Sequence, residues 1–363
     1  MSKDRNIIFH IPLHLDASHA SASQIRPTRL LQAFLDLGYN VDLVEGYGSQ
    51  RAAQIAAIKA KIRQGARYDF LYSESSTMPT LLTEKHHLPT YPFLDFGFFA
   101  FCRRHDIPVG LFYRDIHWRF VNRNKGFKQF VAKYFYRYDL RQYTKLLDVL
   151  FLPSLEMLPH IPFTFPRRVV PLPAGCETRD VPQHTFDGTL RILYIGGIGG
   201  NYDLRLFIQA VNDTPEAELT VCCRPDDWQA VAADYQPLLS DRIHIVHLSG
   251  DDLTQLYADA DLFSMFFTND YIRFAVPYKL FDTMGYGVPV IAPSDTWTGQ
   301  FISRHQAGIV CDFTSTAVSK VLRDLASNPA GLTLFRRNMA SLIPQNTWHA
   351  RASQIADELS HIS

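Results

Sequence analysis

The sequence lacks several features that mark particular classes of protein. None of its five cysteines stands in a CxxC spacing, and two of them, Cys222 and Cys223, are adjacent inside an apolar run. This usage gives no support to a structural metal site and is typical of a reducing compartment. The chain also lacks an excess of either charge, because 36 basic residues balance 36 acidic ones. Net charge therefore does not indicate a nucleic-acid partner.

Long apolar runs and a secretion signal are also missing. No stretch of about 18 apolar residues, the length that spans a membrane as a helix, runs without a charge. The amino-terminal MSKDRNIIFHIPLHL contains His10 and His14 within a short apolar segment and has no small-residue cleavage site. We therefore interpret it as a first strand and expect a cytoplasmic protein, for which any membrane contact would be peripheral.

Short β-branched and aromatic runs alternate with longer helical patterns along the chain, which is typical of parallel βαβ units. One such series fills residues 1–175 and a second fills residues 186–340, with a stretch rich in proline, glycine and charge across residues 173–189. Residues 341–363 indicate a helix, interrupted by Pro344, that crosses back to the first lobe. The sequence thus predicts an α/β protein of two doubly wound, Rossmann-like lobes, with ligands in a cleft at the carboxyl ends of the strands.

The segment FAVPYKLFDTMGYGVPVIA combines a helix start with two opposite charges. Pro277 suits the first turn of a helix, whose free N–H groups attract anions. Lys279 adds a point charge for phosphate oxygens, and Asp282, on the same helix face, can accept hydrogen bonds from two adjacent hydroxyls such as those of a ribose. The segment therefore suits a nucleoside diphosphate. The alternative is a surface ion pair without a ligand.

A glycine-rich turn, YIGGIGGNYDLRLF, follows a predicted strand and precedes a helix that should begin near Asp203. Glycines let a backbone approach a ligand closely, so Gly197, Gly199 and Asn201 are candidates for donor phosphate contacts. Arg224, at the end of the next strand, could touch the base or a phosphate. The turn is not a dinucleotide fingerprint, because the third glycine is out of place and no acidic residue follows the next strand. A tight turn without a ligand remains the alternative.

Polar groups also follow the predicted strands of the first lobe. His117 beside Asp115 could bind a substrate hydroxyl or stabilise charge at the reaction centre. The alternative is a histidine packed in a loop with Trp118. Two further strand ends offer side chains for an acceptor, namely Ser23, Gln24, Arg26, Glu74 and Ser75.

The stretch that runs from Arg119 to Leu147 is basic and aromatic in a chain without net charge. Its single acidic residue is Asp139. Such a helix can lie on an anionic membrane surface. It could instead bind single-stranded nucleic acid or an anionic saccharide, or be a buried aromatic helix with one solvated basic edge. The cations are Arg119, Arg123, Lys125, Lys128, Lys133, Arg137, Arg141 and Lys145.

The order and spacing of YIGGIGGNYDLRLFIQAV, DDLTQLYADADLFSMF and FAVPYKLFDTMGYGVPVIA resemble the second lobe of GT-B-fold glycosyltransferases, in particular the retaining enzymes of family 4, the group 1 type. The resemblance covers most of residues 191–313 and is looser in the first lobe. It implies that Asp282 binds the hydroxyls of the donor ribose and that Lys279 contacts the donor from the same helix. Gly197 and Gly199 would let the donor phosphates approach.

For the first lobe the resemblance implies that His117 lies near the transferred sugar. The chain departs from the family pattern at two places of the donor helix, since an aspartate replaces the usual glutamate at 282 and Phe274 replaces the first glutamate of the motif. Asp270 could be a displaced carboxylate, and Arg273 could replace a missing cation. The glycine loop is also followed by Tyr202, Asp203 and Arg205 instead of the familiar arginine and lysine.

These features predict a hexosyltransferase that uses a nucleoside-diphosphate sugar, with UDP favoured over GDP, and needs no metal. The expected acceptor is a saccharide or a lipid-linked saccharide of surface-polysaccharide synthesis, which leaves a location at the inner face of the cell membrane open. Retention of anomeric configuration is implied by the resemblance. Two other functions remain open: a nucleotide-sugar epimerase or hydrolase that uses Asp115 and His117, and a catalytically silent scaffold subunit. No nucleic-acid partner is expected.

Overall fold

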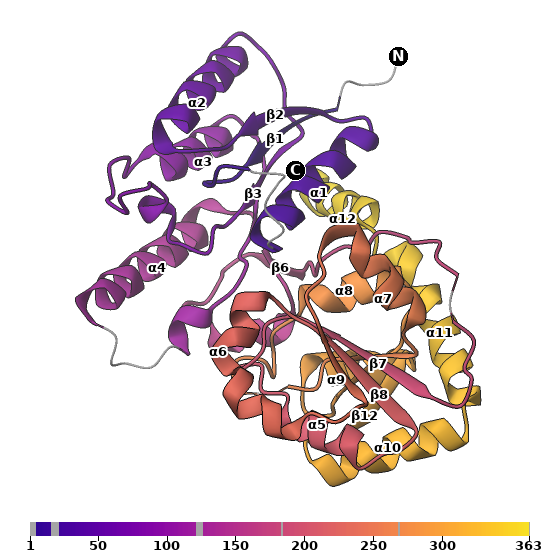
Figure 1. The fold of residues 1–363 in the computed structure, drawn as a ribbon. Helices are drawn as coiled ribbons and strands as arrows, with labels where there is room; N and C mark the ends of the chain where they lie inside the picture. Colours follow the sequence, from indigo (N-terminus) through magenta and orange to yellow (C-terminus); the bar gives the residue numbers. More distant parts are fainter. Residues whose placement is uncertain (1–4, 16–21, 121–125, 183, 268, 363) are drawn as a thin grey trace. The chain divides into compact units, whose positions relative to one another are not determined.

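The computed structural model describes residues 5–15, 22–120, 126–182, 184–267 and 269–362. The chain divides into two compact units (Figure 1). The first unit consists of Met1–Gly175 and Trp348–Ser363, and the second consists of Cys176–Thr347. The expected separate segment 341–363 is therefore shared, because its residues up to Thr347 belong to the second unit and the rest to the first.

The first unit is built on a parallel sheet with the strand order β2-β1-β3-β4-β5-β6. Its described strands are β1 (Asn6–His10), β2 (Asn40–Val44), β3 (Phe70–Glu74), β4 (Val109–Phe112), β5 (Val149–Leu152) and β6 (Arg168–Pro171). Its helices are α1 (Ala22–Asp36), α2 (Gly48–Arg63), α3 (Leu94–Arg104), α4 (Gly126–Leu146) and α12 (Trp348–Ser360), with short 3₁₀ turns at Thr80–Leu82, His117–Arg119 and Leu155–His160. The last helix, α12, packs against α1.

Burial on both faces explains the composition of the central strands in the first unit. FLYSE of β3, VGLF of β4 and VLFL of β5 are buried along their whole length. Strands covered by helices on both faces of a parallel sheet are nearly continuous apolar runs. The two exceptions, Ser73 and Glu74, lie at the carboxyl end of β3 and are both fully buried. Buried polar side chains need partners, so these two indicate a polar network at that end of the sheet.

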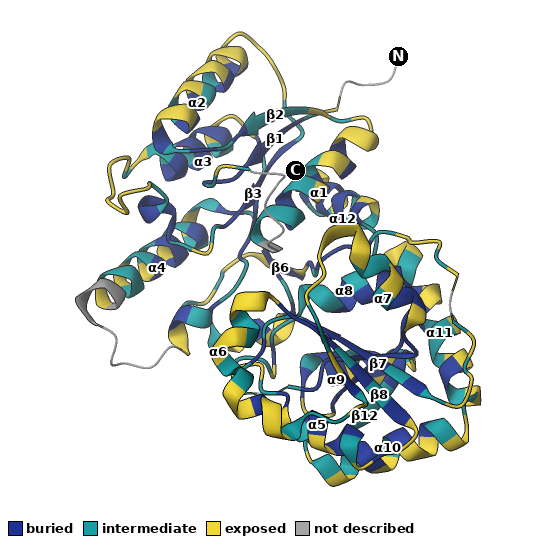
Figure 2. Ribbon diagram, in the orientation of Figure 1, coloured by how far each residue is buried: buried dark blue, intermediate teal, exposed yellow. Residues whose placement is uncertain are grey.

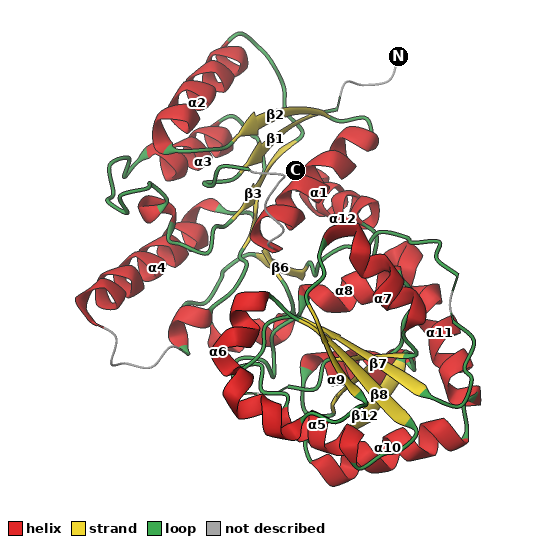
Figure 3. Cartoon of the chain, viewed as in Figure 1, coloured by secondary structure: helices red, strands yellow, loops and turns green. Residues whose placement is uncertain are grey.

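The second unit has a parallel sheet with the strand order β12-β11-β10-β7-β8-β9. Its described strands are β7 (Leu190–Ile195), β8 (Ala217–Cys222), β9 (Ile243–Val246), β10 (Leu262–Ser264), β11 (Val290–Pro293) and β12 (Gly308–Cys311). Its helices are α5 (Arg205–Asn212), α6 (Pro225–Tyr235), α7 (Leu253–Asp259), α8 (Tyr278–Gly285), α9 (Trp297–His305), α10 (Ser315–Ser327) and α11 (Ala330–Leu342). Figure 3 shows how helices surround the strands of this sheet.

The core of the second unit is an apolar cluster between the sheet and its helices. Leu219 and Val221 of β8 pack there with Phe207 and Ile208 of α5, all at most 1% exposed. Figure 2 shows the same division, with dark blue strands inside and yellow outer faces on the helices. Burial of this apolar surface is the main force that holds α5 on the sheet.

α1 starts at Ala22 and contains Pro27. α5 starts at Arg205, because the Asp203 carboxylate accepts a hydrogen bond from the Arg205 N–H and forms a local turn before the helix. Among the described residues, no helix combines the length and the apolar content that crossing a membrane would require.

Candidate functional site

The strand order of the second unit reverses between β7 and β10. The chain moves outward from β7 to β8 and β9, and then returns to the other side of β7 with β10. Ligands of open α/β sheets bind at such a reversal of strand order. The glycine turn follows β7, and residues 265–277 lead from β10 into α8. The two segments selected from the sequence therefore meet at one switch point.

Contacts within the second unit hold the backbone of the glycine turn in place. Gly199 has a φ of +82° and pairs with Tyr202 in a short β-bridge. A β-carbon at this position would lie 2.6 Å from the Val231 side chain of α6. The Tyr194 hydroxyl donates a hydrogen bond of 2.5 Å to the Gly197 carbonyl. The turn is thus a fixed piece of backbone, and glycine is required at 199 for conformation as well as for space.

Lys279 and Asp282 lie together on α8, and Pro277 precedes the first helical residue instead of occupying the first turn. Lys279 Nζ is 3.6 Å from Asp282 Oδ2, so the ion pair that the sequence left as an alternative is present. Both side chains remain about one third exposed, at 36% and 32%. The pair is therefore open to a ligand that could take over its charges. The Tyr257 hydroxyl, which the sequence analysis did not select, lies 3.4 Å from the same oxygen of Asp282.

The other predicted donor contacts differ in what surrounds them. Arg273 Nε is 3.1 Å from Asp295 Oδ2, a partner that the sequence reasoning missed because it follows a different strand, β11. Asp270 is exposed in the turn before Arg273, and Phe274 is buried against Tyr271. Phe274 therefore fills an apolar position in the unit. The remaining two candidates, Asn201 and Arg224, are exposed.

In the first unit, the strand order reverses between β1 and β3, so its switch point lies at the ends of these two strands. Glu74 ends β3 there and accepts hydrogen bonds from Arg26 Nε at 2.9 Å and from the Tyr72 hydroxyl at 2.6 Å. Arg114 Nη2 is 3.3 Å from its second oxygen. Glu74 and Arg26, expected to bind an acceptor, are thus buried and paired with each other.

Arg114 links the other predicted acceptor residue to this ion cluster. The Oγ atom of Ser75, which is buried, accepts a hydrogen bond of 3.0 Å from the Arg114 N–H. Arg26 also donates to the Pro173 carbonyl at 3.1 Å, and its guanidinium carbon lies 3.6 Å from the centre of the Phe112 ring. Ser23 and Gln24 lie on α1 and are half-buried. The sequence signal for Arg114 was its place in YRD, directly after β4.

His117 and Asp115 follow β4 and form a close pair. His117 Nδ1 donates to Asp115 Oδ1, which also accepts the His117 backbone N–H at 3.1 Å. The hydrogen bond to Asp115 raises the pKa of the His117 imidazole above 6.5, although burial opposes the shift. The His117 side chain is 44% exposed. Within the described residues its Nε2 has no hydrogen-bond partner, so this atom is the one available to a substrate.

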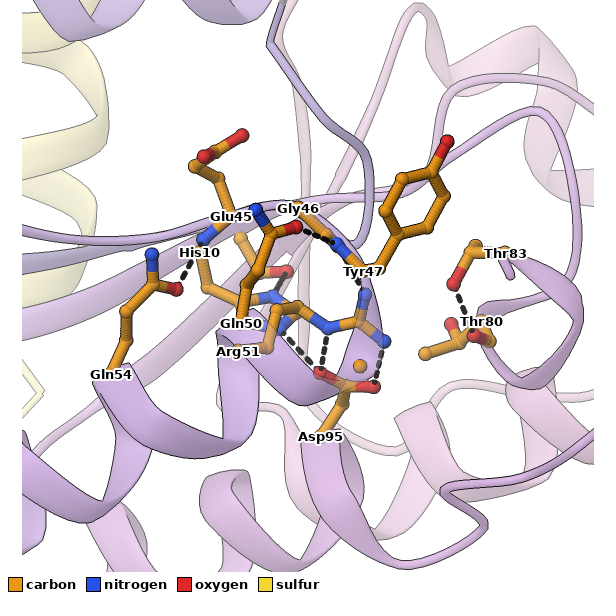
Figure 4. A network of polar contacts seen from close by, with 12 residues as sticks. His10, Glu45, Gly46, Tyr47, Gln50, Arg51, Gln54, Thr80, Thr83 and Asp95 are labelled. Carbon is orange, nitrogen blue, oxygen red and sulfur yellow. Dashed lines mark hydrogen bonds and ion pairs between the residues drawn. The ribbon is translucent and has the colours of Figure 1, made fainter. Parts of the chain in front are cut away.

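A second histidine, missed by the sequence reasoning, anchors a buried network at the same switch point (Figure 4). His10 at the end of β1 contacts Ser73 Oγ at 2.8 Å through Nδ1 and Asp95 Oδ1 at 2.9 Å through Nε2. Arg51 of α2 donates to both oxygens of Asp95, at 2.9 and 3.0 Å. Burial lowers the pKa of His10. The imidazole is therefore neutral, with its proton on Nε2 and the Ser73 hydroxyl donating to Nδ1.

Helix α4 carries the described part of the predicted basic, aromatic stretch. Arg123 and Lys125 lie outside the described residues, and the side chain of Lys128 is not described. Asp139 faces inward and is buried, so the exposed positions of the described helix carry no acidic residue. Phe130 and Tyr134 are 73% and 63% exposed. The exposed cations of this helix are Arg137, Arg141 and Lys145.

No three His, Cys, Asp or Glu side chains of the described ranges lie together as a metal-ion site would require. No protein-family model and no curated protein sequence matches the chain.

Solved structures, in contrast, are similar over nearly the whole chain. HepE from Anabaena in complex with UDP-glucose has 12% identity and a TM-score of 0.65, covering 98% of this chain and 100% of that one. A glycosyltransferase from Rickettsia africae has 12% identity and a TM-score of 0.65, with 99% and 100% covered. WaaG, a glycosyltransferase involved in lipopolysaccharide biosynthesis, has 14% identity and a TM-score of 0.59, with 98% and 100% covered. The likeness confirms the predicted fold class, the two-unit α/β fold of GT-B glycosyltransferases.

Proposed function

We propose that this chain is a glycosyltransferase that moves a hexose-type sugar from a nucleoside-diphosphate sugar to a saccharide or lipid-linked saccharide acceptor. The observation that carries the proposal is that the glycine turn and the segment leading into α8, which holds the Lys279–Asp282 pair, follow the neighbouring strands β7 and β10 at one switch point. UDP is the favoured donor nucleotide, and the complex of Anabaena HepE with UDP-glucose supports this choice. We expect the donor to bind to the second unit and the acceptor to the first.

The charges of the second unit suit a diphosphate leaving group. When the bond between the sugar and the diphosphate breaks, negative charge grows on the diphosphate oxygen. Lys279, Arg273 and Arg224 would stabilise that charge together with the backbone of the glycine turn. Asp282 would hold the ribose hydroxyls. With these cations in place, we propose that transfer requires no metal.

The acceptor side of the reaction is assigned to the first unit. A new bond forms between the anomeric carbon and an acceptor hydroxyl, and the hydroxyl proton leaves to the diphosphate or to solvent. His117, held by Asp115 and open at Nε2, would hydrogen-bond the sugar hydroxyls near the reaction centre. Retention of configuration follows from the resemblance to family 4 enzymes and is part of the proposal.

We further propose that α4 places the protein at the inner face of the cell membrane, where lipid-linked acceptors are available. Support comes from the exposed Phe130 and Tyr134 and from the absence of exposed acidic residues on the described helix. Phe93, 79% exposed, precedes α3, and α3 packs beside α4 through Phe96 and Tyr138. Aromatic side chains and cations together are the composition of a surface helix on anionic lipid.

A turnover assay tests the function against its two alternatives. The purified protein would be incubated with labelled UDP-glucose and other UDP-hexoses, alone or with a lipid extract that contains lipid-linked saccharides. Label that moves into the lipid fraction supports the transferase. Hydrolysis or epimerisation of the donor without acceptor supports the use of His117 and Asp115 in a hydrolase or epimerase. Nucleotide binding without turnover of any donor supports a silent scaffold. The observation that favours this alternative is the buried Phe274, which stands at the motif position of a glutamate.

A further inference from the structure

Tyr257 of α7 is a fixed hydrogen-bond donor beneath Asp282. Its side chain is 1% exposed, and its hydroxyl lies 3.4 Å from Asp282 Oδ2. The ring stacks on Tyr286, with 4.1 Å between ring centroids and an interplanar angle of 6°. It also stacks on Phe263 of β10, at 5.8 Å and 10°. A ring packed between such neighbours cannot move its hydroxyl away, so the contact persists when other groups rearrange.

The two partners of the Asp282 carboxylate engage the same oxygen. Lys279 Nζ and the Tyr257 hydroxyl both lie near Oδ2. No described residue donates a hydrogen bond to Oδ1, and the side chain is 32% exposed. The carboxylate is therefore held at one oxygen and open at the other.

The two partners also differ in how firmly they stay. Lys279 is a flexible, partly exposed cation that a bound diphosphate would attract away from Asp282. Tyr257 is rigid and carries no charge, so a bound phosphate does not attract its hydroxyl away from Asp282. Once a nucleotide is bound, Tyr257 is the partner that continues to orient the carboxylate.

We infer that Tyr257 is a positioning residue that presents Asp282 Oδ1 to the ribose hydroxyls and so makes the site selective for ribonucleotides over 2′-deoxyribonucleotides. This inference rests on the proposed nucleotide-sugar function of the site. A carboxylate held in its binding orientation loses less conformational entropy when a ligand arrives. Without the Tyr257 hydroxyl, Asp282 samples other rotamers and its hydrogen bonds to the ribose weaken.

The test compares two hydroxyl deletions in the same aromatic stack. Tyr257→Phe removes the hydroxyl beside Asp282 and keeps the ring. Tyr286→Phe is the matched control, because its hydroxyl lies 3.3 Å from Thr254 Oγ1 and is not among the contacts of Asp282. Calorimetry with UDP and 2′-deoxy-UDP gives two dissociation constants for each protein. Thermal unfolding of both variants checks that the stack is intact.

We expect the wild type and Tyr286→Phe to prefer UDP over 2′-deoxy-UDP by about tenfold or more, as a hydrogen bond to a charged group supplies. In Tyr257→Phe this preference should fall to about threefold or less. A wild-type ratio in Tyr257→Phe would overturn the inference, even if both affinities fell together.

Failure of the proposed function would give a different result from failure of the inference about Tyr257. If the wild type binds neither UDP nor GDP, the nucleotide site itself is contradicted. A crystal structure of Tyr257→Phe without ligand then tests the positioning of Asp282 separately from nucleotide binding. The inference requires the Asp282 carboxylate to leave its orientation in that variant. A carboxylate that keeps its place without the hydroxyl would overturn it.

Discussion

The Asp139 carboxylate of α4 and the backbone N–H of Thr80 form a buried hydrogen bond of 2.7 Å. The bond joins α4 to the 3₁₀ turn Thr80–Leu82. The other oxygen of Asp139 is buried without a hydrogen-bond partner, and burial raises the pKa of this carboxyl from 3.8 to about 7. A buried carboxyl with one unsatisfied oxygen is costly in its charged form.

We predict that Asp139→Asn stabilises the protein in a pH-dependent way. The folded-state pKa is raised, so the folded chain keeps a proton that the unfolded chain releases, and stability is lost as the pH rises from about 4 through about 7. Asparagine has no proton to lose and still accepts from Thr80. The free energy of unfolding that Asp139→Asn gains over the wild type should grow by at most about 1.4 kcal/mol per pH unit across that window and then remain constant. Urea unfolding as a function of pH measures it; an advantage that does not vary with pH would contradict the assignment.

Two neighbouring glycines offer a matched test of the turn after β7. Gly199 and Gly200 both have positive φ, at +82° and +56°, but only Gly199 has a side chain, that of Val231, within contact of an added β-carbon. Both alanine variants should lose about 1 kcal/mol from backbone strain. Gly199→Ala should lose more stability and also weaken nucleotide binding, because Val231 must move. Equal effects of the two substitutions on unfolding and on UDP affinity would argue against a packed phosphate turn.

His10 and His117 should titrate on opposite sides of 6.5, the ordinary pKa of histidine. Burial lowers the pKa of His10, whereas the hydrogen bond to Asp115 raises that of His117. NMR titration of the imidazole signals, assigned with His10→Gln and His117→Gln, measures both values. Asp115→Asn should bring the His117 pKa down and leave His10 unchanged. A His117 that titrates below 6.5 in the wild type would contradict the charged pair.

The sign of each shift fixes its effect on stability. The raised pKa of His117 means that its pairing with Asp115 stabilises the fold fully below about 6.5 and is lost as the pH rises through the folded-state value. The lowered pKa of His10 means that its buried contacts stabilise the fold above about 6.5 and weaken as the pH falls. His10→Gln should therefore cost most stability at neutral pH and progressively less in acid.

Binding to anionic vesicles tests the proposed role of α4. Arg137→Glu with Arg141→Glu should weaken sedimentation with acidic lipid by about thirtyfold or more at low salt, since each cation near the surface contributes about 1 kcal/mol. Phe130→Ser with Tyr134→Ser should weaken it at both low and high salt. The matched control is Lys320→Glu with Arg323→Glu, which makes the same change of charge at two exposed positions of α10. Wild-type protein that does not sediment with acidic vesicles at low salt would end the membrane proposal.

The alternation of strands and helices, and with it the fold class, could be predicted from the sequence because parallel strands buried on both faces are short apolar runs. FLYSE and VLFL show this plainly. Helix starts were less predictable. Pro277 suits a first helical turn, yet α8 begins one residue later, at Tyr278.

Partners across the sequence could not be predicted at all. The positions of Lys279 and Asp282 follow from helical spacing, but the Tyr257 hydroxyl of α7 contacts Asp282 only in the folded chain. Likewise, Arg26 and Glu74 were recognised as polar groups at strand ends, while their mutual burial depends on the order in which β1 and β3 pair. His10 gave no signal, because a buried network has no spacing rule in one sequence.

Calorimetric binding of UDP, GDP and their hexose conjugates tests the central claim most directly, namely that the second unit holds a nucleoside diphosphate between its glycine turn and α8. We predict selective binding of UDP and UDP-hexose by the wild type, with affinity reduced about tenfold or more in both Lys279→Ala and Asp282→Ala. Absence of nucleotide binding by the folded wild type, or wild-type affinity in both variants, would contradict the account.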